Sequence, residues 1–124
     1  MAEDNPTNAQ VLKRMLKALK ISVRHVENGQ QAVNIYMREH FDFVVMDIEM
    51  PILDGEEATR QIRQFEADEQ RERTPIFGLT ANAMDEQRDR YLRAGMDLHL
   101  VKPIRLWELA EAIKRWTGYH REQS

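Results

Sequence analysis

The sequence contains no cysteine. This absence excludes disulfide bonds, zinc sites with thiolate ligands and cysteine nucleophiles. No apolar run approaches the roughly 20 residues that a helix needs to cross a bilayer, and the opening residues MAEDNP lack the apolar core of a signal peptide. We therefore expect no membrane contact and a cytoplasmic location.

A block of basic residues is missing as well. The chain has 18 Lys and Arg residues against 21 Asp and Glu residues, a formal net charge of -3. A mildly acidic chain of this kind is a poor candidate for direct binding to nucleic acid. Its hydrophobic fraction of 42% is too high for a disordered chain. We expect one domain over residues 1–124, with a polar and frayed tail at residues 118–124.

Two periodicities alternate along the sequence. Short apolar runs predict strands at residues 21–26, 43–46, 76–79 and 98–101. Apolar residues at helical spacing predict helices at residues 6–19, 32–37, 58–65, 85–94 and 106–116. Asn5 is a candidate N-cap of the first helix, with Pro6 at its first position, and Gly95 is expected to end the fourth. This alternation indicates an open α/β domain with a mostly parallel sheet.

The start of the chain does not fit this pattern. A parallel α/β unit normally opens with a strand, but only Met1 and Ala2 precede the acidic pair of Glu3 and Asp4. Two residues cannot form a full strand when strands average about five to six residues. Either the first strand is truncated or the sheet is built differently.

Polar residues follow the predicted strands at their carboxyl ends, where open parallel sheets bind ligands. Asp47, Thr80 and Lys102 each come directly after an apolar run. Glu3 and Asp4 would follow whatever remains of a first strand. Carboxylate oxygens suit Mg²⁺, and the hydroxyl and the ammonium group could hold an anion beside it. A metal, a carboxylate nucleophile and an anion clamp together support aspartyl-phosphate formation.

Each of these residues also has an ordinary structural explanation. A solvated acid at a strand end, a threonine that caps a turn and a surface lysine are common, and an acidic helix start complements the helix dipole. Taken one at a time, these explanations are favoured. All of these residues occur at consecutive strand ends, and this coincidence makes the functional interpretation the better one.

Four runs of the sequence resemble one known family in its own order and cover nearly the whole chain. They are EDNP at residues 3–6, MDIEMP at 46–51 followed by DG at 54–55, LTANA at 79–83 and VKPI at 101–104. The chain resembles the response-regulator receiver domain. The third run and residues 58–63 resemble the receivers of hybrid histidine kinases in particular.

The resemblance implies a flavodoxin-like fold, a doubly wound open parallel sheet with helices on both faces, whose first strand is here truncated or missing. It also implies that Asp47 is the phosphoryl acceptor. Asp4, Asp47 and the backbone carbonyl of Glu49 would bind Mg²⁺, and Glu3 would act on the metal through water.

The same resemblance implies a switch. Thr80 would hydrogen-bond the phosphoryl group and shift toward it on activation. Lys102 would pair with a phosphoryl oxygen, and its bond to Pro103 would be cis, an isomer essentially confined to X–Pro bonds. His99 lies three residues before the lysine, where the family carries Tyr, Phe or His. It either carries the movement of Thr80 to the surface or simply fills a position in the strand.

The implied function is that of a phosphoacceptor signalling module in a two-component system. A histidine kinase or a histidine phosphotransfer domain would donate the phosphoryl group, and a partner-binding face would switch. We expect no turnover of a separate substrate. In the family's sheet the first strand is central, so its loss would either bring residues 21–26 beside residues 43–46 or leave an open edge. We therefore expect weakened Mg²⁺ binding, because Glu3 and Asp4 lose rigid support, and a homo-oligomer paired through that edge.

Two other functions stay open. The first is a phosphorylation-independent interaction module that retains only a degenerate site. The second is a haloacid-dehalogenase-type phosphatase, which needs a second aspartate two residues after the nucleophile, where this chain has Glu49. Its acidic pair would also lie downstream of the nucleophile rather than at residues 3 and 4.

Overall fold

The computed structural model describes residues 1–81 and 85–117, without the side chains of residues 85–87. The end of the LTANA run and the expected frayed tail lie outside these residues. The elements follow one another in the order α1 (Pro6–Ala18), α2 (Gly29–Arg38), β1 (Val44–Asp47), α3 (Gly55–Asp68), β2 (Ile76–Thr80), α4 (Asp85–Ala94), β3 (Leu98–Val101) and α5 (Leu106–Thr117).

Capping residues decide where the helices begin. The Asn5 side chain accepts a hydrogen bond from the N–H of Asn8 at 3.0 Å, with Pro6 at the first helical position, as predicted. Asn28 and Asp54 cap α2 and α3 in the same way. Both helices start three residues before the predicted positions, because the cap, and not the first apolar residue of the period, sets the first turn.

The described strands form a parallel sheet in the order β1-β2-β3. Val44 pairs with Ile76, and Phe77 pairs with Leu98. β1 and β2 are buried along their whole length, which agrees with their continuous apolar runs, since parallel strands are covered on both faces.

The predicted strand at residues 21–26 is wrong. Within the described residues this segment contributes only an isolated parallel bridge, from Val26 to Ala2, and Ala2 makes a second bridge to Met46. The Ala2 N–H donates to the carbonyl of Val45 at 2.8 Å, and the Ala2 carbonyl accepts from Asp47 at 3.0 Å. Ala2 is therefore a one-residue remnant of the first strand in the central position. It stands between Val26 and Met46, so the segment that ends at Val26 does not pair directly with β1.

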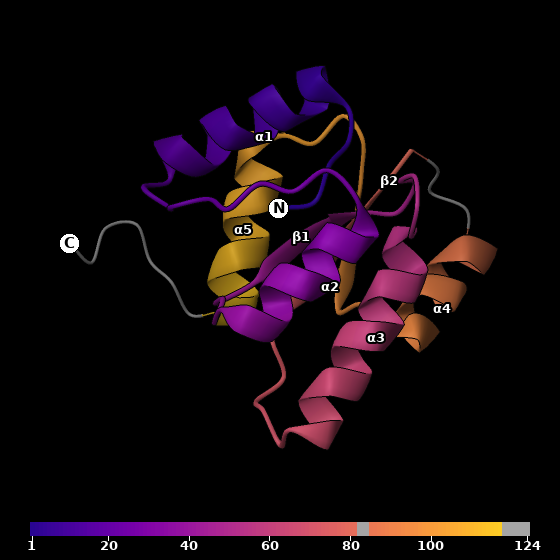
Figure 1. Cartoon of the computed structure of the whole chain (residues 1–124). Helices are drawn as coiled ribbons and strands as arrows, with labels where there is room; N and C mark the ends of the chain where they lie inside the picture. Colours follow the sequence, from indigo (N-terminus) through magenta and orange to yellow (C-terminus); the bar gives the residue numbers. More distant parts are fainter. Residues whose placement is uncertain (82–84, 118–124) are drawn as a thin grey trace.

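Helices cover both faces of the sheet, with α1 and α5 on one face and α2, α3 and α4 on the other (Figure 1). Val45, Phe77, Leu79 and Leu100 pack toward the first pair of helices. Met46 and Ile76 pack toward the second group. None of the described helices is both long and apolar enough to cross a membrane.

Two adjacent residues of α1, one buried and one exposed, test which face of this helix packs against the sheet. Leu12 is 3% exposed in the layer beneath α1, whereas Val11 is 44% exposed. We expect Leu12→Ala to lower the free energy of unfolding by about 2–4 kcal/mol, because it removes buried methyl groups and leaves a cavity. Val11→Ala should change it by less than about 0.5 kcal/mol. Urea denaturation measures both, and equal losses would contradict the assigned faces of α1.

Candidate functional site

The carboxyl edge of the sheet gathers the polar residues that the sequence singled out. Asp47 and Thr80 are the last residues of β1 and β2, and Lys102 follows β3. Because the strands are parallel, all three lie at the same edge. Glu3 and Asp4 follow Ala2 onto that edge, and carboxylate oxygens of Glu3, Asp4 and Asp47 lie within 4.8 Å of one another.

The Lys102 side chain reaches into this carboxylate cluster from the end of β3. Its Nζ lies 3.1 Å from Oδ2 of Asp47 and 3.3 Å from Oε1 of Glu3. The Lys102 N–H donates to the carbonyl of Thr80 at 2.7 Å, and the bond to Pro103 is cis, as expected from the sequence. One ammonium group thus faces two buried carboxylates.

Burial dominates the electrostatics of Glu3, whose side chain has no accessible surface. It raises the pKa of Glu3 to about 7, with further contributions from the hydrogen bond and the charge of Asp47, while Lys102 acts in the opposite direction. The pKa of Lys102 is raised: burial lowers it, but the hydrogen bond and charge of Asp47 and the charge of Glu3 outweigh burial.

The donor set fits a hard divalent cation. Oε1 of Glu3 is buried and, among the described residues, accepts no hydrogen bond, although it forms the ion pair with Lys102. A buried oxygen in that state needs a ligand or an ordered water. Three carboxylates so close together repel one another, and Mg²⁺ prefers such oxygen ligands while retaining several waters. The cluster therefore suits Mg²⁺ in chemistry and in position.

The backbone around Asp47 is held closely. The Glu49 N–H donates to Oδ1 of Asp47 at 3.2 Å, which places the Glu49 backbone beside the carboxylate. Gly55, the first residue of α3, packs so tightly that a Cβ there would collide with the carbonyl oxygen of Asp47. A glycine at this position lets α3 begin directly against the end of β1.

Sequence reasoning missed His25 as a supporting residue, because nothing in its spacing distinguishes it from a surface histidine. Its Nε2 lies 2.9 Å from the backbone carbonyl of Glu3. The Glu3 N–H also donates to Val26 at 3.0 Å. The structure therefore does not show the expected loss of support at Glu3, since the Ala2 remnant and this histidine hold its backbone. The expected weak Mg²⁺ affinity stays a prediction.

Thr80 and His99 lie on adjacent strands. Thr80 is buried at the end of β2. His99, in β3, pairs in register with Gly78 of β2. The His99 ring meets the ring of Tyr91 from α4 edge to face, with centroids 6.5 Å apart. Burial, followed by the charge of Arg88, lowers the pKa of His99. The contact with Tyr91 links the strand to α4, whereas a role in switching stays a prediction.

Comparison with known families decides the assignment. The profile of the response regulator receiver domain matches residues 1–114. The chain belongs to this family. This membership gives the phosphatase alternative no support.

Sensor kinases contain similar receivers. The chain is 41% identical over 116 residues to sensor protein GacS of Pseudomonas syringae pv. syringae, covering 94% of this chain and 13% of that protein. It is 42% identical over 106 residues to sensor protein EvgS of Escherichia coli K12, covering 86% and 8%. The chain thus spans only a small part of these relatives.

Two solved structures share the fold. The receiver domain of sensor histidine kinase PA1611 from Pseudomonas aeruginosa PAO1, which has a magnesium ion in its active-site cleft, is 42% identical with a TM-score of 0.85, covering 95% of this chain and 94% of that one. The receiver domain of Ssk1 from Saccharomyces cerevisiae, in complex with the histidine phosphotransfer protein Ypd1, is 33% identical with a TM-score of 0.90, covering 94% and 86%.

The raised pKa of Glu3 has a consequence for stability. A carboxyl whose pKa rises on folding stabilises the fold below its unfolded value near 4.5, and that contribution is lost as the pH rises through about 7. In metal-free protein, wild type should therefore lose up to about 3 kcal/mol relative to Glu3→Gln between pH 5 and pH 8.

Urea denaturation with a chelator present measures this difference. The amine of Met1, whose pKa burial lowers to about 5, titrates in both proteins and cancels. The exposed Glu111→Gln serves as a matched control with no such dependence. Parallel stability–pH curves for wild type and Glu3→Gln would show that Glu3 is not held in a buried, charge-crowded position.

Proposed function

We propose that this receiver takes a phosphoryl group onto Asp47 in a Mg²⁺-dependent reaction and switches a partner-binding face. One observation carries the proposal: Lys102 and the carboxylates of Glu3 and Asp4 converge on the Asp47 side chain, which is buried at the end of β1. Such a cluster can both hold a divalent cation and neutralise a transferred phosphoryl group.

In the proposed step, an oxygen of Asp47 attacks the phosphorus of a phosphohistidine. The new bond joins that oxygen to phosphorus, and the bond from phosphorus to the imidazole nitrogen breaks, with the electron pair leaving on the nitrogen. Lys102 neutralises charge on one phosphoryl oxygen, and the Thr80 hydroxyl donates to another. Bound Mg²⁺ would supply further charge neutralisation, held by Asp4, Asp47 and the carbonyl of Glu49, with Glu3 acting through water.

The donor we propose is a histidine kinase or a histidine phosphotransfer domain. The resemblance to hybrid sensor kinases and to a receiver in complex with such a phosphotransfer protein supports this choice. The output face would be built from the last two strand–helix units, β2 with α4 and β3 with α5. In the second unit the large side chain of Trp107 is 66% exposed, with Val101 and Leu106 also exposed. Apolar residues grouped on a surface are typical of a contact site for another protein.

The proposal includes the remaining expectations from the sequence. Residues 1–124 would act as one domain in the cytoplasm, without turnover of a separate substrate and without contact to nucleic acid or membrane. Any pairing of two copies would use a sheet edge left by the short first strand. His99 would pass the movement of Thr80 toward α4 through its contact with Tyr91.

Phosphorylation of Asp47 can be measured directly. With acetyl phosphate and Mg²⁺, the intact protein should gain the mass of one phosphoryl group, and Asp47→Asn should gain none. Asp42→Asn, at the opposite end of β1, removes an exposed carboxylate and should behave as wild type. The absence of a mass gain in wild type, together with no spectral response to beryllofluoride, would favour the phosphorylation-independent interaction module.

Replacing Lys102 separates catalysis from metal binding. Lys102→Met should slow phosphorylation by acetyl phosphate about 100-fold or more, because one preorganised cation is lost. Mg²⁺ affinity, followed by isothermal titration, should not fall, because a positive charge has left the surroundings of the metal. Lys114→Met, on the exposed side of α5, is the control. Unchanged phosphorylation in Lys102→Met would remove the lysine from the proposed mechanism.

A further inference from the structure

Helix α4 is attached to the rest of the protein by few apolar side chains. Among its described side chains only Tyr91 and Ala94 are buried, and the largest other apolar one, Leu92, is 40% exposed. Elements with little apolar burial belong to the less stable part of a fold. Polar contacts therefore have a large share in setting the position of α4.

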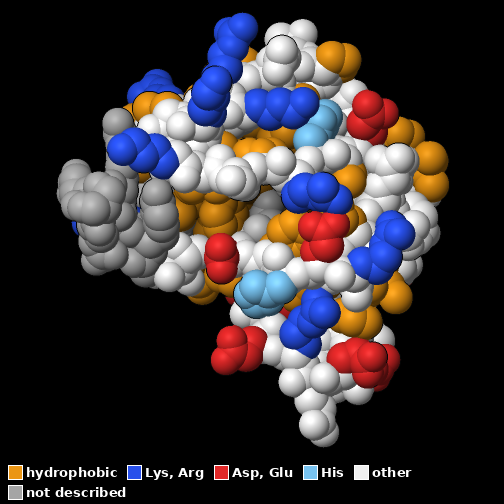
Figure 2. All heavy atoms as spheres, turned by 60° about the vertical axis from the view of Figure 1, so that its left-hand side comes forward, with side chains coloured by type: hydrophobic (Ala, Val, Ile, Leu, Met, Phe, Trp, Pro, Cys, Tyr) orange, Lys and Arg blue, Asp and Glu red, His pale blue; other side chains and the backbone are white. Residues whose placement is uncertain are grey.

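One polar contact joins the middle of α4 to the start of α3. The guanidinium of Arg90 donates from Nε to Oε1 of Glu56 at 2.6 Å and from Nη2 to Oε2 at 2.9 Å. A two-pronged pair of this kind fixes orientation as well as distance. Figure 2 shows acidic and basic side chains interspersed on an exposed face, where ion pairs contribute little to stability. Glu56 differs from these groups, because its side chain is only 7% exposed.

Burial makes the Glu56 carboxylate dependent on a neighbouring cation. A buried carboxylate has lost its hydration, and a positive charge has to offset that loss. The hydrogen bond from Arg90 lowers the pKa of Glu56 and outweighs burial, which raises it. Arg60 lies farther away, with Nη2 at 3.4 Å from Oε1 of Glu56. If Arg90 withdrew, the buried charge would be poorly compensated, so the pair favours one position of α4.

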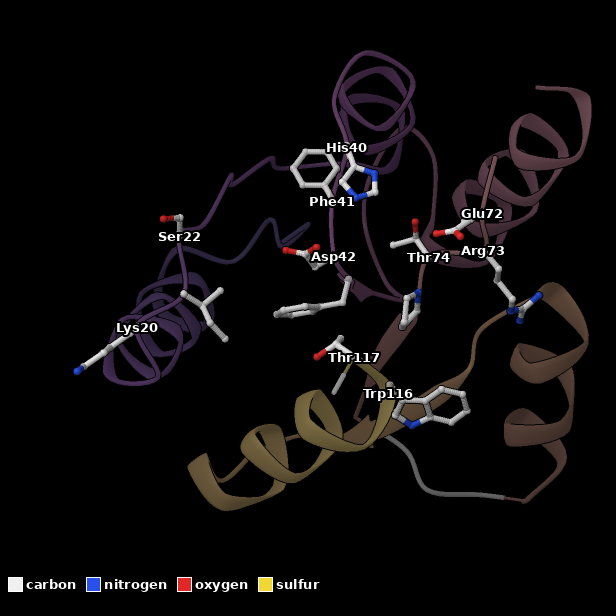
Figure 3. Close-up of a pocket in the computed structure, with 13 residues that line it drawn as sticks. Lys20, Ser22, His40, Phe41, Asp42, Glu72, Arg73, Thr74, Trp116 and Thr117 are labelled. Carbon is white, nitrogen blue, oxygen red and sulfur yellow. The ribbon is translucent and has the colours of Figure 1, made fainter. Parts of the chain in front are cut away.

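The carboxyl end of α4 has a separate anchor. Arg63 of α3 donates from Nε to the carbonyl of Gly95 at 2.9 Å and from Nη2 to Asp97 at 2.8 Å. Arg73 donates to the same two residues, and Figure 3 shows its side chain reaching the end of α4. Gly95 has a φ of 116°, and a Cβ there would lie 2.7 Å from Cγ of Arg63. The backbone therefore turns against Arg63 at a position that favours glycine.

The two attachments of α4 differ in how easily they can open. Arg63 makes four hydrogen bonds and its side chain is 14% exposed, so its withdrawal would disturb several segments at once. The Arg90 side chain is 59% exposed, and water can hydrate its guanidinium once it leaves Glu56. The contact in the middle of α4 can thus open while the carboxyl end of the helix stays in place.

Tyr91 connects this contact with the phosphorylation site. It follows Arg90 directly, and its ring meets the ring of His99 with centroids 6.5 Å apart. His99 pairs with Gly78 of β2, the strand that ends at Thr80. A shift of Thr80 toward a phosphoryl group and an opening of the Arg90 contact would therefore both act on the packing of Tyr91.

We propose that the ion pair of Arg90 and Glu56 is a latch, which favours the resting position of α4 and opens when Asp47 is phosphorylated. The latch rests on the function proposed above, because it has a role only if phosphorylation shifts Thr80. Since α4 belongs to the proposed output face, an open latch would change that face. By linkage, a contact that opposes the phosphorylated state also weakens the binding of a phosphoryl mimic at Asp47.

Removing either half of the latch tests the proposal on the full chain. Arg90→Met keeps the apolar stem, and Glu56→Gln keeps the shape of the buried side chain. Each variant should bind beryllofluoride about fivefold more tightly than wild type, measured by isothermal titration at saturating Mg²⁺. Arg93→Met removes an exposed arginine from the same helix and is the matched control, with the affinity of wild type.

The signs of the two effects separate a latch from a general change of charge. Beryllofluoride is anionic, so the loss of a positive charge alone would weaken its binding and the loss of a negative charge alone would strengthen it. A latch predicts tighter binding in both variants. The double variant should gain no more than either single variant, because both substitutions open the same contact. A merely structural role would not tighten binding in Arg90→Met.

Amide hydrogen exchange follows α4 without any ligand. Exchange at residues 90–94 should be faster in Arg90→Met than in wild type, whereas exchange in β1 should not change. If wild type does not bind beryllofluoride, the proposed function fails and the latch fails with it. If wild type binds it, the latch alone is overturned by effects of opposite sign in the two variants, by affinities equal to wild type, or by unchanged exchange in α4.

Discussion

The burial of two carboxylates beside one ammonium group is the constraint on which the rest of this receiver depends. Glu3 and Asp47 are almost fully enclosed, and Lys102 is the cation that reaches both. Bringing like charges together out of water is costly unless a cation offsets it. This edge of the sheet therefore favours the binding of a group that adds positive charge, or a reaction that redistributes negative charge. That is the property a metal-dependent phosphoryl acceptor needs.

Backbone contacts made by short segments hold these charged side chains together despite this free-energy cost. Ala2, a strand of one residue, is bonded on both sides and sets the position of Glu3. His25, in the segment before α2, acts on the Glu3 backbone, and Gly55, the first residue of α3, lies against the Asp47 backbone. Ala2 thereby occupies a position in the sheet between Val26 and Met46.

Much of this could be predicted from the sequence because it depends on local chemistry. The Asn5 cap, the stop at Gly95 and the runs that form β1, β2 and β3 are readable from residue type and period. The early starts of α2 and α3 were missed because the cap precedes the apolar period. Residues 21–26 have the alternation of a strand but lack an adjacent partner, and a strand exists only when its backbone groups are paired.

The order of the elements and the residue types at the strand ends were determined by the sequence itself, since periodicity, caps and the ligand chemistry of carboxylates depend on neighbouring residues alone. The tertiary structure decided the rest: that Ala2 would stand between Val26 and Met46, and that a histidine without any motif would hold Glu3. These features depend on which distant backbone groups face one another, and pairing across 20 or more residues leaves no signal in local spacing.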